Sequence, residues 1–217
     1  MEDLKVEIIE DILVESDLKF KVIVLGNAFV GKTCIISKAS KNIFTETYSV
    51  TLGFDKLPFN VKIDDKIISL ELWDTCGTEK YKSLIKKFYK NSAAAIIVYS
   101  IESKESFDDI FKFWLNDVKL ECNPDIKIFL IGNKADLDNE RKVKLKDAEK
   151  VSKENGFSYF CETSAKNGLN IKELFVQVAK ILYGEHLRFK ERAMKIENNI
   201  PVPVKINKNK NEKKGCC

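Results

Sequence analysis

The sequence feature that most constrains the fold is the octapeptide GNAFVGKT at residues 26–33. It directly follows the apolar run 20–25, so a strand is predicted to lead through a glycine-bounded turn into a helix. In the pattern G-x-x-x-x-G-K-[ST], backbone N–H groups at a helix N-terminus surround phosphate oxygens. Lys32 neutralises the β- and γ-phosphates, and Thr33 offers its hydroxyl to Mg²⁺. A strand, a turn and an unrelated helix are the alternative, because short patterns recur by accident.

A second motif, GNKADL at residues 132–137, follows another apolar run and concerns the base. The Asp136 carboxylate accepts from the ring N–H and the exocyclic amine of guanine, whereas adenine presents an acceptor at that ring nitrogen. Guanine is therefore predicted over adenine. Asn133 is expected to tie this loop to the phosphate loop, and the Lys134 stem to cover one face of the base. ETSAK, at residues 162–166, is expected to add a backbone N–H for the guanine carbonyl, so the bound ligand is predicted to be GTP or GDP.

The segments GNAFVGKT, YSVTLGFD, WDTCGTEKY, GNKADL and ETSAK occur in the order and spacing of small Ras-like GTPases, which the sequence resembles over about residues 19–184. It is most similar to the Rab family. The segment FYKNSAAAIIVYSI has the Rab form, and no Rho-type insertion follows Asp136. The chain ends in Cys216-Cys217 rather than in a four-residue prenylation box. The resemblance implies a GTP/GDP-dependent switch in vesicle-mediated protein transport that hydrolyses GTP to GDP and phosphate.

The resemblance also implies roles for the switch residues. Thr51 gives its hydroxyl to Mg²⁺ and its N–H to the γ-phosphate, Gly77 donates its N–H to the same phosphate, and Asp74 holds Mg²⁺ through water. Phe44 matches the aromatic residue that packs against guanine. Thr51 as a strand residue and Asp74 as a turn carboxylate are the alternatives.

The predicted nucleotide-binding residues are Asn27, Ala28, Val30, Gly31, Lys32, Thr33, Cys34, Phe44, Thr51, Asp74, Gly77, Asn133, Lys134, Asp136, Leu137, Ser164, Ala165 and Lys166. The predicted metal ligands are Thr33, Thr51 and, through water, Asp74. The predicted catalytic residues are Lys32, Thr51, Gly77 and Thr78.

Two residues depart from the family pattern. Thr78 stands where the family has the glutamine that orients the attacking water, and its side chain is too short for that role. Slow intrinsic hydrolysis is therefore predicted, with dependence on an activating protein. Phe29 is bulky at a loop position where relatives carry a small residue, so either it obstructs an activator's arginine or it points away without effect on catalysis. Cys76 and Ser100 also differ from the family, and no function is assigned to either.

Apolar and amphipathic segments alternate along the chain. Strands are expected at residues 20–25, 56–63, 66–73, 93–99, 126–131 and 157–161. Helices are expected at residues 32–40, 79–90, 104–121, 146–155 and 170–183. This order predicts an α/β fold, the G domain of P-loop NTPases, with a doubly wound, mostly parallel sheet of six strands. Asp64-Asp65 is a two-residue hairpin signal, so one edge strand is expected to be antiparallel.

The segments that flank the domain, residues 19–184, differ from it in composition. Residues 1–18 form an acidic extension, for which a helix packed on the domain or a disordered segment is favoured over a partner site. The helix is considered because the apolar residues of this extension have roughly helical spacing: Leu4, Ile8, Ile9, Ile12 and Leu13. Residues 185–217 are rich in Lys and Asn and carry little apolar surface, which predicts a flexible basic tail.

The cysteines fall into two groups. Four of them are scattered without metal-binding spacing and are expected to be small buried thiols: Cys34, Cys76, Cys122 and Cys161. The Rab resemblance implies geranylgeranyl groups on Cys216 and Cys217, and an unmodified tail is the alternative. Two lipid chains give stable anchoring at about 0.8 kcal/mol per buried CH₂, and the tail lysines add attraction to an anionic leaflet. The expected location is the cytoplasmic face of an intracellular membrane, with a cytosolic pool.

The implied partners follow from the same resemblance. Effectors are expected to read residues 51–55, Trp73 and the helix beginning near Thr78. An exchange factor, a GTPase-activating protein, a GDP dissociation inhibitor and the prenylation machinery are expected to act on a monomer. Nucleic acid is disfavoured because the net charge is only +4 and no aromatic residues interleave with the tail lysines. A Rab-like scaffold that holds GTP with little hydrolysis is the competing hypothesis, and a P-loop kinase or ATPase is disfavoured by the GNKADL motif.

Overall fold

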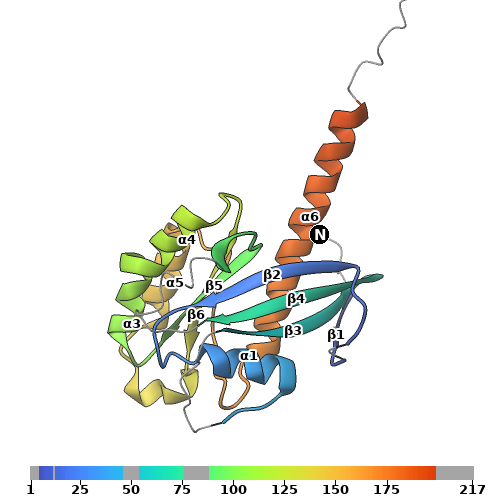
Figure 1. The fold of residues 1–217 in the computed structure, drawn as a ribbon. Coiled ribbons are helices and arrows are strands. Elements are labelled where there is room, and N and C mark those ends of the chain that lie inside the picture. Colours follow the sequence, from blue (N-terminus) through green and yellow to red (C-terminus); the bar gives the residue numbers. More distant parts are fainter. Residues whose placement is uncertain (1–4, 12, 46–53, 76–87, 199–217) are drawn as a thin grey trace, which may run out of the picture. The chain divides into compact units, whose positions relative to one another are not determined.

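The computed structural model describes residues 5–11, 13–45, 54–75 and 88–198. The chain divides into two compact units, residues up to Gly184 and residues from Glu185 onward. The first unit is an α/β domain built on one sheet (Figure 1). Along the described part of the chain, no helix is long and apolar enough to cross a membrane.

The sheet has seven strands over the described residues, in the order β1-β3-β4-β2-β5-β6-β7. Their bounds are β1 Val6–Ile9, β2 Leu18–Leu25, β3 Phe54–Ile63, β4 Lys66–Thr75, β5 Ala94–Ser100, β6 Lys127–Asn133 and β7 Tyr159–Glu162. Strands β4, β2, β5, β6 and β7 run parallel to one another, whereas β3 is antiparallel to β4 and β1 is antiparallel to β3. The mostly parallel, doubly wound sheet is confirmed. The predicted number of six strands is wrong, because the edge strand β1 was not predicted.

Helices cover both faces of the sheet. The helical bounds are α1 Lys32–Lys41, α3 Lys104–Asp109, the π-helical turn η2 Ile110–Trp114, α4 Leu115–Glu121, the 3₁₀ turn η3 Ala135–Glu140, α5 Leu145–Glu154 and α6 Ile171–Asn198. Strand β2 explains the two layers, because alternate side chains of a strand point to opposite faces. Val22 and Val24 pack in the core that α1 and the start of α6 cover, whereas Ile23 and Leu25 pack in the core that α3, η2, α4 and α5 cover.

The acidic extension contributes a strand rather than a helix, which corrects the prediction for this segment. Residues Val6–Ile9 pair antiparallel with residues 60–63 of β3, and the Asp64 N–H donates to Lys5 O at 3.0 Å. Val6 and Ile8 pack against the core as alternate residues of the strand. The helical spacing failed because a short apolar run fits either period, and the open edge of β3 supplies hydrogen-bond partners that favour a strand. Leu4 and Ile12 lie outside the described residues.

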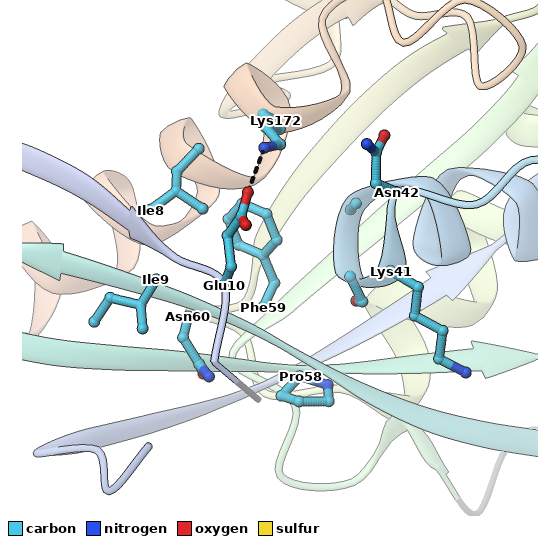
Figure 2. A pocket seen from close by; sticks show the side chains of 11 residues that line it. Ile8, Ile9, Glu10, Lys41, Asn42, Pro58, Phe59, Asn60 and Lys172 are labelled. Atoms are coloured by element: carbon cyan, nitrogen blue, oxygen red, sulfur yellow. Dashed lines mark hydrogen bonds and ion pairs between the residues drawn. The ribbon is translucent and has the colours of Figure 1, made fainter. Parts of the chain in front are cut away.

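Beyond β1, two polar contacts fix the chain to the domain. Asn60 Nδ2 donates to Asp11 O at 2.8 Å, and the Glu10 carboxylate lies 3.3 Å from Lys172 Nζ at the start of α6. Figure 2 shows this ion pair at the rim of a pocket of about 210 Å³ between β1, β3, the end of α1 and α6. Of the predicted nucleotide-site residues that the structure describes, none lines it. Residues 6–11 of the N-terminal extension thus contact the domain through a strand and two polar contacts.

Several predicted elements have different bounds in the structure. The two-residue hairpin is confirmed: Ile63 pairs with Lys66, and Asp64 adopts a left-handed φ of 53°. The single helix expected at 104–121 is interrupted by η2. Helix α6 continues to Asn198, so residues 185–198, which were predicted to belong to the basic tail, are helical. Most of the helix expected at 79–90 lies outside the described residues, as do residues 199–217.

Candidate functional site

The glycine loop between β2 and α1 has the backbone that its glycines permit. Gly26 and Gly31 adopt φ of 138° and 95°. A Cβ on Gly26 would lie 2.2 Å from Val98 O, and one on Gly31 would lie 2.3 Å from Asn133 Nδ2. Only glycine fits both positions, because each needs a positive φ and a close approach of neighbouring atoms. The loop therefore lies directly against β5 and the end of β6.

Phe29 occupies a left-handed position in the same loop. Its φ is 66°, and its side chain is 62% exposed. A non-glycine residue in this region is strained by about 1–2 kcal/mol. Because the residue is largely exposed, burial of the ring offsets little of this strain. The left-handed backbone at this position therefore favours glycine.

Lys32 is the first residue of α1, and its side chain reaches back to the start of the glycine loop. It is 6% exposed, and its Nζ donates to Gly26 O at 2.9 Å and to Asn27 O at 2.8 Å. Among the described residues, no side chain caps the N-terminus of α1, and the first turn holds no acidic residue. The positive end of the helix dipole and a buried ammonium thus face the same loop, an arrangement that favours an anionic ligand.

Thr33 and Asp74 bring two hard oxygen groups together. The Thr33 Oγ1 donates to Asp74 Oδ2 at 2.6 Å, and Asp74, near the end of β4, is 3% exposed. A hydroxyl and a carboxylate next to a phosphate loop are the ligand types that Mg²⁺ prefers. These residues fit a magnesium ion shared with a bound phosphate.

Asn133 links the loop after β6 to the phosphate loop, as the sequence predicts. It is 2% exposed, and its Nδ2 donates to Val30 O at 2.9 Å. Its Oδ1 accepts from Thr163 Oγ1 at 3.2 Å and from the Ala165 N–H at 3.4 Å. One side chain thereby joins three loops that are distant in sequence.

The neighbouring residues of these loops are also held in place. Ser164 Oγ donates to Asp136 Oδ1, and the Asp136 side chain is exposed. Lys134 adopts a left-handed φ of 66°, and its Nζ forms an ion pair with Glu102. The carboxylate expected to select guanine is therefore oriented by a residue of the ETSAK motif.

The remaining predicted residues lie around this cluster or outside the described residues. Phe44 is half-buried and packs against the core, Cys34 is half-buried, and burial raises the pKa of its thiol. Ala28 and Leu137 are half-buried, whereas Lys166 is exposed. Outside the described residues are Thr51, Cys76, Gly77, Thr78, Cys216 and Cys217. Cys122 and Cys161 are half-buried free thiols rather than fully buried ones.

Sequence reasoning missed the residues that support the loops from a distance. Glu102 holds Lys134, Thr163 bonds Asn133, and Asp109 and Trp114 bond the side chain of Asn27. No local pattern marks Asp109 or Trp114, because their partner lies more than eighty residues earlier in the chain. Only the packing of α3 and η2 against the phosphate loop brings them together.

The fold and this cluster define a P-loop nucleotide-binding protein of the α/β class. A comparison with protein families matches residues 21–183 to the model of the Ras family. The chain belongs to the Ras family of small GTPases, whose members bind GTP or GDP with Mg²⁺ and act as switches.

Proposed function

We propose that this protein is a Rab-like small GTPase that binds GTP and GDP and regulates vesicle-mediated protein transport at a membrane. The observation that carries the nucleotide assignment is the Asn133 link between the phosphate loop and the two base-binding loops. Asp136 and Lys32 therefore lie on loops that hydrogen bonds join to one another. The Rab assignment is supported by the Rab form of FYKNSAAAIIVYSI and by the adjacent cysteines Cys216 and Cys217.

In this proposal each described residue acts on one part of the nucleotide. Lys32 and the first N–H groups of α1 bind the phosphates. Thr33 and, through water, Asp74 hold Mg²⁺, which neutralises phosphate charge when it is bound. Asp136 accepts from the two guanine donors, and the Ala165 region approaches the guanine carbonyl.

Hydrolysis depends on the switch residues, which lie outside the described residues. Thr51 and Gly77 contact the γ-phosphate in this proposal, and Thr78 replaces the glutamine that orients water. The threonine hydroxyl lacks the reach and the paired donor and acceptor of an amide. Intrinsic hydrolysis is therefore slow, and an activating protein supplies the missing groups.

A GTP-held scaffold is the second candidate, because Phe29 adds a specific observation to Thr78. The Phe29 ring is 62% exposed on the phosphate loop, where an activator's arginine has to enter. If the ring obstructs that entry, the protein remains in the GTP state and works by recruiting effectors. The two candidates differ in turnover and not in nucleotide binding.

Membrane attachment is the remaining part of the proposal. Geranylgeranyl groups on Cys216 and Cys217 anchor the protein to the cytoplasmic face of an intracellular membrane, and a GDP dissociation inhibitor maintains a cytosolic pool. Lysines of the 205–214 segment add attraction to anionic lipid. Replacing both cysteines with serine is expected to move the protein from membranes to the soluble fraction in cells, and unchanged membrane association would contradict the lipid anchor.

The experiment that tests the proposed function follows phosphate release from bound GTP. Purified protein is loaded with radiolabelled GTP, with ATP as competitor, and single-turnover release is measured with Mg²⁺ beside Thr78→Gln. Retention of guanine but not adenine nucleotide, and faster release from Thr78→Gln, are expected. Equal competition by ATP would contradict the guanine assignment. Equal release rates from both forms would contradict the role of Thr78.

A further inference from the structure

The side chain of Asn27, the second residue of the phosphate loop, is held by two residues of the segment 104–121. Its Nδ2 donates to Asp109 Oδ2 at 2.8 Å, and its Oδ1 accepts from Trp114 Nε1 at 2.7 Å. Asp109 is 8% exposed and Trp114 is 2% exposed. We call these three residues the Asn27 clamp. Both ends of the Asn27 amide are bonded, so its orientation is fixed.

The chemistry of the clamp admits few residues at position 27. A carboxylate accepts and an indole N–H donates, so a side chain between them has to offer one donor and one acceptor. An amide does this. An aspartate at position 27 would accept from Trp114 but would face the Asp109 carboxylate with a second negative charge. An apolar residue would remove the hydrogen bonds that Asn27 makes with the buried Asp109 carboxylate and the Trp114 N–H, which is costly.

The π-helical turn η2 explains how Asp109 and Trp114 reach the same side chain. Asp109 ends α3 and Trp114 ends η2, five positions later. In a regular α-helix, residues five apart point about 140° away from one another, since each residue turns by about 100°. The wider π turn reduces this angle, and such turns are rare and frequent at functional sites. The interruption of the predicted helix thus has a structural use at the phosphate loop.

The clamp is connected to the lysine that faces the phosphates. The backbone carbonyl of Asn27 accepts from Lys32 Nζ at 2.8 Å, while the side chain of the same residue is held by Asp109 and Trp114. We propose that Asp109 and Trp114 are positioning residues that fix Asn27, and through it the backbone around Lys32, in the geometry that retains nucleotide. This inference rests on the proposed nucleotide binding and adds two residues of the α3–η2 segment to its determinants.

A purely structural role makes a different prediction. If Asp109 and Trp114 only fill the core beneath the sheet, their loss lowers thermal stability without a specific change in nucleotide release. If they position the loop, their substitution accelerates nucleotide release more than an equally destabilising substitution at another site does. Val118 of α4 is the matched control, because it is fully buried in the same core as Trp114. Its side chain carries no polar group, so it cannot hydrogen-bond the phosphate loop.

The experiment exchanges the charges of the clamp. Dissociation of a fluorescent GDP analogue is followed for wild type, Asn27→Asp, the double variant Asn27→Asp with Asp109→Asn, Trp114→Phe and Val118→Ala. Asn27→Asp is expected to release GDP roughly tenfold faster, because a buried bond becomes a repulsive pair. The double variant is expected to return to within about threefold of wild type, because the new carboxylate accepts both from Trp114 and from the amide introduced at position 109.

The milder variants complete the test. Trp114→Phe keeps most of the ring volume and removes the N–H, so release several-fold faster than wild type is expected, whereas Val118→Ala lowers the melting temperature and leaves release unchanged. Wild-type release from Asn27→Asp and Trp114→Phe, or a double variant as fast as Asn27→Asp, would overturn the clamp. Wild-type protein that takes up no fluorescent GDP would contradict the proposed function and the clamp with it. Normal GDP binding with unaltered release in every variant would contradict the clamp alone.

Discussion

Substitution of Ile8 in the N-terminal strand is expected to destabilise the domain measurably. Ile8 is half-buried against the main core as part of β1. Full burial of an isoleucine contributes about 1.5–3 kcal/mol, so half of it contributes about 1 kcal/mol. An amide at the same place adds about 1 kcal/mol for incomplete hydration. Ile8→Asn is therefore expected to lower the free energy of unfolding by about 2 kcal/mol.

The control lies in the same apolar stretch. Leu13 is 88% exposed, so Leu13→Asn is expected to change the free energy of unfolding by less than about 0.5 kcal/mol. Both variants are compared with wild type by urea denaturation in saturating GDP and Mg²⁺, which keeps the contribution of bound ligand equal. Equal losses from the two variants, or none from either, would refute the packing argument.

Hydrogen exchange gives an independent reading of the same strand. The Asp64 N–H donates to Lys5 O, whereas the Ile67 N–H donates to Asp17 Oδ2 at 2.8 Å, outside β1. Deletion of residues 1–10 is expected to remove protection from the Asp64 amide and to leave that of Ile67. Retained protection at Asp64 would mean that β1 does not cover this edge in solution.

Three further predictions concern the site and the thiols. Asn133→Asp turns the bond to Val30 O into a repulsive contact, so GDP dissociation is expected to accelerate by at least about tenfold; a wild-type rate would contradict the link between the loops. Phe29→Gly is expected to be more stable than Phe29→Ala by about 1 kcal/mol in urea denaturation, because both lose the ring and only glycine relaxes at a φ of 66°; the reverse order would contradict the strain. Burial raises the pKa of Cys122 to about 11 and that of Cys161 to about 12, so both thiols are protonated at pH 8. Both are expected to react with iodoacetamide far more slowly than glutathione at pH 8, and faster as the pH rises toward these pKa values. Rapid alkylation at pH 8 would contradict their burial.

The sequence by itself determined the α/β class, the phosphate loop and the residue types that surround it. These are local properties: a strand, a turn that needs glycine and a helix N-terminus form one continuous segment. The hairpin at Asp64-Asp65 was likewise predictable, since two-residue turns have a strong local signal. The tie from Asn133 to the phosphate loop was expected from the GNKADL motif, and the 2.9 Å bond to Val30 O agrees with it.

Only the tertiary structure decided what the flanking segments and the interrupted helix do. Residues Val6–Ile9 form a strand because β3 offers an unpaired edge, a partner more than fifty residues away that no local period reveals. Asp109 and Trp114 reach Asn27 because a π turn changes the direction of their side chains. Local sequence sets propensities within a few turns, whereas these contacts depend on which distant surface packs against each segment.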